Sequence, residues 1–206
     1  AVILSGARPV YLDSSVNRHY GIFGPVPKAT LLAAMQANPQ AKALILTSCT
    51  YDGFRYDLAP IIAAAHEYGI KVIVDEAWYG CGRFHPAFRP TALECGADYA
   101  TQSTHKVLSA FSQASMIHVN DPDFNGHLFR ENLNMHTSTS PQYGLIASLD
   151  VARKQAVMEG YKLLSRSLRL AAELREQINA TGVFRVLDLE ALARHLTPVR
   201  EAAAGD

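Results

Sequence analysis

Polar side chains gather at the points where three predicted strands end. The runs Thr47 to Tyr51, Asp75 to Trp78 and Ser103 to Lys106 each lie at the end of a predicted strand. In an open parallel α/β sheet, ligands bind outside the carboxyl ends of the strands. Three adjacent strand ends of this kind would form one polar pocket, and reactive groups are expected there.

A carboxylate and an amine stand out in this pocket. Lys106 follows Asp75 by the length of one connection and one strand, so both side chains can face the same ligand. A lysine that forms a Schiff base and an aspartate directed at a pyridinium nitrogen are the minimum protein groups that pyridoxal phosphate needs. The spacing alone is weak support, because many α/β proteins end a strand in an aspartate that only caps the next turn.

Strands and helices alternate along the chain and would position these residues. Short β-branched or aliphatic runs predict strands at Pro9 to Leu12, Ala43 to Thr47, Lys71 to Val74, Tyr99 to Gln102 and Met116 to Val119. The second and third runs are apolar almost throughout, as expected for parallel strands with helices over both faces.

Two amphipathic segments predict helices that cross between the strands. One runs from Pro27, which suits a first helical turn, to Asn38. The other opens with Asp57 as an N-cap and stops at Gly69. The order of strand, helix and strand predicts an α/β fold with a mostly parallel sheet and flanking helices.

A single long helix is predicted from Gly144 to about Ala180, with Gly160 expected to weaken or bend it. A strand is predicted after it, at Val183 to Leu187, followed by a tail that offers no further core. We interpret the chain as three parts: a sheet domain over residues 1–143, a connecting helix over 144–181, and the start or remnant of a second, smaller domain over 182–206.

The composition excludes several classes of function. The chain is 49% apolar and 18% charged, which fits a globular domain with its own core. Lys and Arg total 19, as do Asp and Glu, so no net charge would attract nucleic acid or an anionic membrane surface. No apolar run is long enough to span a membrane, and the three cysteines show no CxxC pair. We therefore expect a soluble, cytoplasmic protein with a small-molecule partner.

Motifs for other cofactors are incomplete. The histidines show neither HExxH nor a paired Cys/His spacing, so no metal site is predicted. Gly80-Cys81-Gly82 lacks the third glycine of a dinucleotide loop. Cys81 is interpreted as part of a plain turn of small residues, with a reactive thiol as the alternative. Because the chain begins at Ala1 on an apolar run, we expect it to be a piece of a larger polypeptide.

The segment Thr101 to Ser115, TQSTHKVLSAFSQAS, carries a longer signal. It resembles the pyridoxal-phosphate attachment site of the bacterial ornithine/lysine/arginine decarboxylases. Further blocks agree with that family in order, at Ser5 to Ala7, Gly24 to Pro27, Thr50 to Gly53, Asp75 to Gly80, Gly96 to Asp98 and Gln113 to Val119. The likeness covers most of residues 1–180 and implies the large domain of a fold type I enzyme, the fold of aspartate aminotransferase.

The resemblance implies a role for each residue of the pocket. Lys106 would hold the cofactor covalently, and burial beside it would favour the neutral amine. Asp75 would pair with the pyridinium nitrogen. Trp78 would donate its indole N–H to the phenolic oxygen of the cofactor, or else pack in the core.

Three further residues would complete the cofactor site. Ser103 and His105 match family positions that contact the phosphate, through a hydroxyl and an imidazole donor. The small side chain of Ala77 would let the ring lie against the strand end. Lys106 or His105 would return a proton to the former α-carbon after carbon dioxide leaves.

The implied activity is the decarboxylation of ornithine, lysine or arginine to the corresponding amine, by a homodimer or larger homo-oligomer. Two alternatives stay open: an aminotransferase that uses the same sheet and lysine, and a catalytically silent module. Family members are several times longer than this chain. Their upstream phosphate cradle, their ring-stacking histidine and most of their small domain lie outside it.

Overall fold

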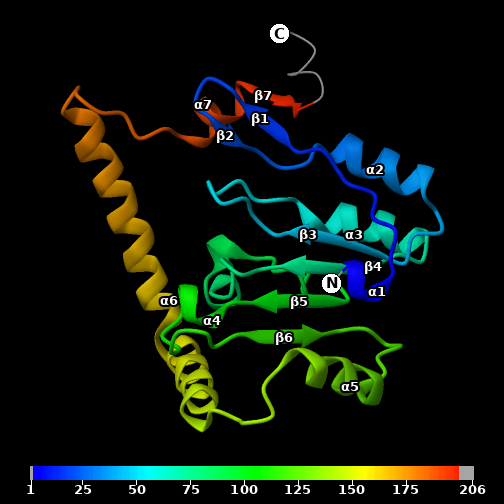
Figure 1. Cartoon of the computed structure of the whole chain (residues 1–206). Helices are drawn as coiled ribbons and strands as arrows, with labels where there is room; N and C mark the ends of the chain where they lie inside the picture. Colours follow the sequence, from blue (N-terminus) through cyan, green and yellow to red (C-terminus); the bar gives the residue numbers. More distant parts are fainter. Residues whose placement is uncertain (1, 200–206) are drawn as a thin grey trace.

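The computed structural model describes residues 2–199, which are arranged around a four-stranded sheet (Figure 1). The strands lie in the order β3 (Ala43–Thr47), β4 (Lys71–Asp75), β5 (Tyr99–Gln102) and β6 (Met116–Val119). The first three are parallel, whereas β6 is antiparallel to β5. These strands confirm the four predicted between residues 43 and 119, and the mostly parallel sheet confirms the α/β class.

Two helices cover one face of this sheet. They are α2 (Lys28–Ala37) and α3 (Leu58–Glu67), which pack against each other, and α3 also contacts β4. Their buried side chains and those of the strands form the main core, which includes Leu31, Met35, Leu46, Ile61, Ile62, Val72 and Val74. Both crossover helices are therefore confirmed.

The end of α3 follows from its sequence. Gly69 has a φ of +68°, a conformation that glycine adopts without strain. The amide of Gly69 donates to the carbonyl of His66 at 2.9 Å, and that of Ile70 donates to Ala65 at 3.0 Å. This pair of bonds is a Schellman motif, which satisfies the last carbonyls of the helix. Asp57 holds the N-cap position as predicted, but its side chain makes no capping hydrogen bond.

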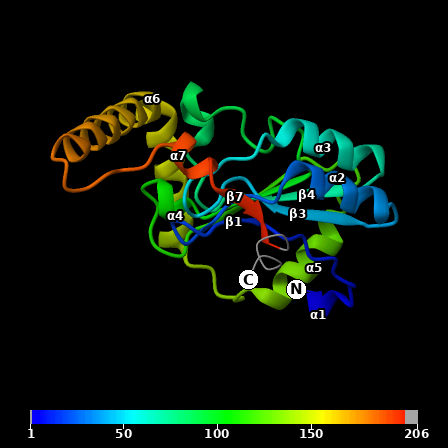
Figure 2. The same cartoon turned by 90° about the horizontal axis from the view of Figure 1, so that it is seen from above.

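The opposite face of the sheet is largely open, so the expected cover of helices on both faces is wrong for this chain. Ile45 and Ile117, on the two outer strands, are 67% and 47% exposed. Two helices, α1 (Val2–Ser5) and α5 (Gly126–His136), lie on that side in Figure 2. Neither contains a buried residue. An apolar strand therefore has a second apolar face here without a helix packed on it.

A second, smaller sheet joins residues far apart in the sequence. Its strands are β2 (Ile22–Phe23), β1 (Ser15–Asn17) and β7 (Leu196–Pro198), paired antiparallel in that order. The predicted strand at Pro9 to Leu12 is wrong: those residues are irregular, and Tyr11 is 81% exposed. The chain pairs instead at β1, where the buried Asn17 side chain donates to the carbonyl of Leu192 at 2.7 Å.

The long helix is confirmed as α6 (Tyr143–Ala180). Its buried residues recur every fourth position, at Ser148, Ala152, Ala156 and Gly160. Gly160 does not break the helix. Instead, a Cβ at this position would lie 2.9 Å from the Cβ of Phe84, so the glycine allows a close approach. Within residues 2–199, no helix combines the length and the apolar character needed to cross a membrane.

The remaining elements are short. They are the 3-10 turns η1 (Gly82–Phe84) and η2 (Pro86–Phe88), and the helices α4 (Thr104–Val107) and α7 (Leu189–Ala193). The strand predicted at Val183 to Leu187 is wrong, because that segment is irregular and Val183 and Phe184 are each 74% exposed. The tail instead adds α7 and β7. The assignment of residues 182–206 to a second domain stays a prediction.

Candidate active site

The sheet brings the three predicted strand ends together. Asp75, the last residue of β4, lies in register with Thr47 of β3 and Thr101 of β5. Main-chain hydrogen bonds continue past the strands, from the Ser48 amide to the Asp75 carbonyl and from the Glu76 amide to the Thr101 carbonyl, both at 2.8 Å. Figure 1 shows α4 and one half of α6 at the end of the sheet towards which β4 and β5 point.

Asp75 offers one carboxylate oxygen to the solvent. Its Oδ1 accepts a hydrogen bond from the Ala77 amide at 2.8 Å, so the turn-capping role considered above is present. No described residue donates to Oδ2, and Asp75 is exposed. Capping and ligand binding are therefore compatible, because the turn fixes the carboxylate through one oxygen and leaves the other to accept a hydrogen bond.

Lys106 lies over the ring of Trp78. Its Nζ is 5.1 Å from the ring centroid, within the range of a cation–π contact. Trp78 in turn meets the ring of Tyr51 edge to face at 5.7 Å. Trp78 is 49% exposed, so it is not a core residue. The expected burial of Lys106 is wrong for this chain, where the residue is exposed.

Ser103 is placed by the helix that follows it. It is the N-cap residue of α4, yet its hydroxyl makes no capping hydrogen bond. Its carbonyl accepts from the Lys106 amide at 2.9 Å, which fixes the single helical turn that carries the lysine. The half-buried Ser103 hydroxyl is thus available to a ligand.

The imidazole of His105 is fixed at one nitrogen. Its Nδ1 lies 2.9 Å from the carbonyl oxygen of Ala114. Because a carbonyl can only accept, Nδ1 carries the hydrogen. In the neutral ring, Nε2 is then an acceptor, so His105 donates to a phosphate through Nε2 only as the imidazolium. This refines the expected role of His105 as an imidazole donor.

Thr104 was not singled out from the sequence. Its side chain is 1% exposed, and its Oγ1 is buried with no hydrogen-bond partner among the described residues. A buried hydroxyl without a partner costs free energy, and native structures contain few. The signal in the sequence was its position between Ser103 and His105, two residues that were both predicted to contact the cofactor.

A buried carboxylate ties two of the strand ends together. Glu76 is 1% exposed, and its Oε1 accepts from the Ala92 amide at 2.8 Å. Its Oε2 accepts from the Gln102 side chain at 2.8 Å. The Gln102 Oε1 lies 2.9 Å from Nε2 of His118 on the neighbouring strand. Glu76 follows Asp75 and Gln102 precedes Ser103, so these hydrogen bonds hold the backbone next to both site residues in place.

The cysteines near the strand ends are not activated nucleophiles. Burial raises the pKa of the Cys49 and Cys81 thiols. A raised pKa disfavours the thiolate, which is the nucleophilic form. This supports the interpretation of Cys81 as part of a plain turn. Across residues 2–199, no three His, Cys, Asp or Glu side chains are grouped to hold a metal ion.

A hollow of about 270 Å³ opens beside Lys106. Apolar residues line most of it, among them Phe84 of η1, Val107 of α4 and Leu164 of α6. The lining contains no acidic side chain, so it offers no ion-pair partner for the distal cation of a basic amino acid. An ion pair with such a cation would need residues outside this hollow.

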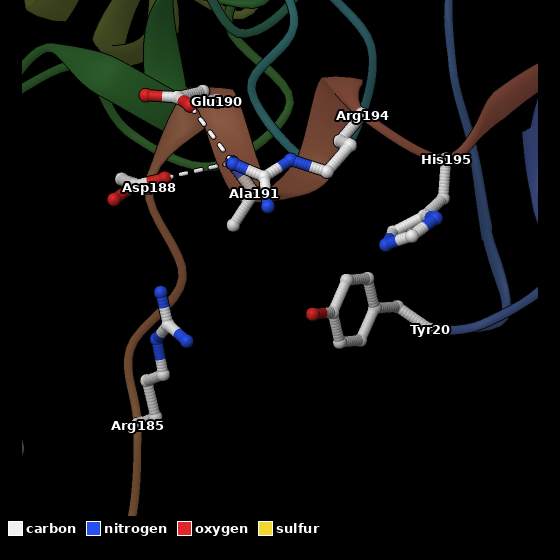
Figure 3. A pocket seen from close by; sticks show the side chains of 7 residues that line it. All are labelled: Tyr20, Arg185, Asp188, Glu190, Ala191, Arg194 and His195. Atoms are coloured by element: carbon white, nitrogen blue, oxygen red, sulfur yellow. Dashed lines mark hydrogen bonds and ion pairs between the residues drawn. The ribbon is translucent and has the colours of Figure 1, made fainter.

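A second hollow, of about 200 Å³, lies between Tyr20, after β1, and α7 (Figure 3). Its acidic groups are engaged within the helix: Glu190 pairs with Arg194 at 2.9 Å, and Asp188 accepts from the Ala191 amide at 2.8 Å. It contains none of the predicted site residues. The candidate active site therefore remains at the strand ends.

Pyridoxal phosphate, the cofactor that the resemblance implies, fits the groups present. The site offers an amine for its aldehyde (Lys106) and a carboxylate oxygen for its pyridinium nitrogen (Asp75). A hydroxyl (Ser103) and an imidazole (His105) can meet its phosphate. Hydroxyl, imidazole, amine and carboxylate groups suit this cofactor better than a metal ion or a dinucleotide.

Comparisons with known proteins identify the family of the chain. A family model described as "Orn/Lys/Arg decarboxylase, major domain" matches residues 1–199. An arginine decarboxylase of Bacillus cereus is 36% identical over 180 residues, which cover 87% of this chain and 39% of the relative. A lysine decarboxylase of Pseudomonas aeruginosa is 41% identical over 183 residues, which cover 78% of this chain and 24% of the relative.

A solved structure shows the same architecture. The constitutive lysine decarboxylase of Escherichia coli superposes with a TM-score of 0.67 and 30% identity, over 82% of this chain and 26% of that protein. The chain thus spans at most 39% of the length of these proteins. Together, the matching family model, these relatives and this structural likeness show that the chain belongs to the Orn/Lys/Arg decarboxylase family and has the fold of the type I pyridoxal-phosphate enzymes.

Proposed function

We propose that the chain is the lysine-bearing part of a pyridoxal-phosphate enzyme that decarboxylates a basic amino acid. The observation that carries the proposal is the convergence of Asp75, Trp78 and Lys106 at one end of the sheet. Lys106 and Trp78 are in contact, and Asp75 lies three residues before the tryptophan at the end of β4. The relatives named arginine and lysine decarboxylase support a basic substrate.

Each side chain then has a defined task. Lys106 attaches the cofactor through its amine, and Oδ2 of Asp75 accepts a hydrogen bond from the protonated ring nitrogen. The hydroxyl of Ser103 and the ring of His105 bind the phosphate, and Trp78 donates its indole N–H to the phenolic oxygen. When bound, the cofactor accepts the electrons that remain as carbon dioxide leaves the substrate.

Ala77 is proposed to shape the space for the cofactor, and Lys106 or His105 to supply a proton. Ala77, half-buried and two residues after Asp75, leaves room for the cofactor ring against the strand end. The amine of Lys106 or the imidazolium of His105 supplies the proton that completes the amine product. The complete protein is proposed to be a cytoplasmic homo-oligomer. A mass measurement of the native enzyme tests its oligomeric state.

Covalent labelling tests this proposal on the chain itself. The chain is incubated with pyridoxal phosphate, reduced with borohydride and digested, and the modified peptide is identified by mass spectrometry. We expect the phosphopyridoxyl group on Lys106, no label after Lys106→Ala, and unchanged labelling after Lys154→Arg, which alters an exposed lysine of α6. Label spread over other lysines with Lys106 unmodified would refute the assignment.

Product analysis of the complete protein separates the reactions. Carbon dioxide with a diamine or agmatine supports decarboxylation, whereas a keto acid supports an aminotransferase. Arginine, lysine and ornithine are compared as substrates in the same assay. The apolar hollow beside Lys106 has no acidic lining, so we expect residues beyond this chain to decide among the three.

A second candidate function follows from the exposure of Lys106. The exposed amine and the limited share of its relatives that the chain spans favour a folded module that does not turn over alone. Such a chain would bind the cofactor weakly and release no carbon dioxide from any basic amino acid. Turnover by residues 1–206 alone would exclude this candidate.

A further inference from the structure

One backbone carbonyl controls both the position and the tautomer of His105. The carbonyl oxygen of Ala114 accepts from the His105 amide at 3.2 Å and lies 2.9 Å from its Nδ1. Ala114 itself is buried, at 4% exposure. Because the two bonds share one acceptor, any shift of this carbonyl moves the imidazole with it.

A tight turn presents that carbonyl. The Ala114 amide donates to the carbonyl of Phe111 at 3.1 Å, which closes a four-residue β-turn. Gln113, the third residue of the turn, has a φ of +76°. This is the position at which a type II turn needs a positive φ and normally carries glycine or asparagine. No other non-glycine residue within 2–199 has a positive φ.

The side chain of Gln113 does not explain this conformation. It is exposed and makes no hydrogen bond with the part of the chain that the structure describes. The turn is anchored at its other end, where the Phe111 amide donates to Oγ of the buried Ser148 in α6 at 3.1 Å. A sparsely populated backbone conformation that its surroundings hold in place is a frequent feature of active sites.

We propose that the turn from Phe111 to Ala114 is a positioning device for the phosphate end of the cofactor, with Gln113 as its positioning residue. The left-handed backbone of Gln113 aims the Ala114 carbonyl at Nδ1 of His105. Nε2 is then the one ring nitrogen left for the phosphate. The nature of the ligand rests on the proposed function, whereas the state of the ring in the ligand-free chain does not.

Three variants of the 206-residue chain separate backbone from side chain. Gln113→Gly removes the side chain and keeps a positive φ accessible, so His105 should stay in place. Gln113→Val introduces a β-branched residue that disfavours this conformation, so the turn should open. Ser112→Val makes a comparable change at the neighbouring exposed residue, where φ is not positive, and serves as the matched control.

The first readout is the nitrogen-15 spectrum of the His105 ring in the cofactor-free chain, assigned by its loss in His105→Asn. At a pH where the ring is neutral, we expect hydrogen on Nδ1 in the wild type, Gln113→Gly and Ser112→Val. Gln113→Val should instead move towards the Nε2–H tautomer. A wild-type ring with its hydrogen on Nε2, or a folded Gln113→Val chain with an unchanged ring, would overturn the inference. Should the valine variant not fold, the wild-type ring alone decides.

The second readout compares the affinities for pyridoxal phosphate and for pyridoxal, which lacks the phosphate. In Gln113→Val the imidazole is no longer held in place, so whatever its tautomer it should lose its hydrogen bond to the phosphate, which should lower the ratio of the two affinities on the order of tenfold. The ratio should be unchanged in Gln113→Gly. An unchanged ratio in Gln113→Val together with the wild-type tautomer counts against the positioning role. Failure to label Lys106 would instead count against the proposed function. The ring spectrum would still test the positioning role of the turn.

Discussion

The two ends of the four-stranded sheet treat their polar groups in opposite ways. At the start of β4, Lys71 lies 3.5, 2.6 and 3.0 Å from carboxylate oxygens of Asp98, Asp121 and Asp123. At the end of the same strand, Asp75 keeps one oxygen without a donor, and Lys106 forms no ion pair within the described residues. A charged cluster that satisfies itself serves the fold, whereas groups left without protein partners suit a ligand.

The charges at the amino end reinforce one another. The hydrogen bond from Lys71, followed by that from Tyr99, lowers the pKa of Asp121 to about 2. The hydrogen bond to Asp121 raises the pKa of Tyr99 to about 12. Burial works against the charged form of Asp98, but its bonds with the Val72 amide and His66 outweigh that effect and lower its pKa. Such mutual satisfaction leaves nothing for a substrate.

The largest expected effect is at the carboxyl end, on catalysis. In the complete protein, Asp75→Asn should lower kcat about a thousandfold, on the order of 4 kcal/mol of barrier, because an amide no longer keeps the cofactor nitrogen protonated. The fold should persist, since the asparagine oxygen can still accept from the Ala77 amide. Steady-state kinetics and circular dichroism measure the two quantities.

Asp57→Asn is the matched control for Asp75→Asn. Asp57 is exposed, holds the N-cap position of α3 and makes no capping hydrogen bond through its side chain, so its charge should not affect turnover. Equal kcat values for Asp75→Asn and the wild type would show that the open carboxylate at the end of β4 has no role in the reaction.

The features that the sequence predicted are those that neighbouring residues determine. The four strands of the main sheet, between residues 43 and 119, were predicted from short β-branched or aliphatic runs, and Gly69 ends α3 through local hydrogen bonds. Likewise, Asp75 and Lys106 could be found because each follows a strand, and parallel strands end at one edge. Local signals thus located the site and its elements.

The features that the sequence did not predict depend on distant partners. Asn17 is polar, yet fully buried in β1, because the Leu192 carbonyl 175 positions away accepts from its amide. Glu76 is buried because Ala92 and Gln102 supply two donors. The left-handed Gln113 was missed because glutamine is not a residue that type II turns prefer at this position. None of these pairings has a periodic or local signature.

A smaller effect is expected on the stability of the carboxyl end. The Glu76 carboxylate accepts hydrogen bonds from the Ala92 amide and the Gln102 side chain. Glu76→Gln places an N–H₂ group against one of these two donors, so the free energy of unfolding should fall by about 1–3 kcal/mol. The reciprocal variant Glu76→Gln with Gln102→Glu restores a donor–acceptor pair and should recover part of the loss. Chemical denaturation measures both, and no difference between single and double variants would contradict the pairing.

A still smaller effect is expected where α6 supports this end. Gly160→Ala places a Cβ 2.9 Å from that of Phe84. The resulting overpacking should exceed the gain in helix propensity and lower stability by about 1 kcal/mol. Gly144→Ala, in the first turn of the same helix with no heavy atom within 4 Å, should instead be neutral or stabilising. If denaturation curves showed that both substitutions change the free energy of unfolding in the same direction, the close contact between Gly160 and Phe84 would not be the cause.

The smallest effect is expected on the pH dependence of stability, at the end of the sheet where β4 starts. Asp121 has an ordinary pKa of 3.8, which is lowered to about 2 in the folded chain. Because the folded state holds the proton less tightly, the carboxylate stabilises the fold above about pH 4, and this contribution is lost as the pH falls towards about 2. Asp121→Asn cannot titrate. Its midpoint of thermal unfolding should therefore lie below that of the wild type at about pH 6, with the difference narrowing as the pH is lowered.

Asp150→Asn supplies the comparison for this measurement. Asp150 pairs with Arg153 at 2.8 Å, but both side chains are more than half exposed, at 71% and 56%. Solvent screens such a pair, so its removal should change the midpoint less than the loss of Asp121 does at every pH. If both variants showed the same profile, the amino end would be an ordinary charged surface. The contrast between the paired charges at the start of β4 and the unpaired groups at its end would then rest on Asp75 and Lys106 alone.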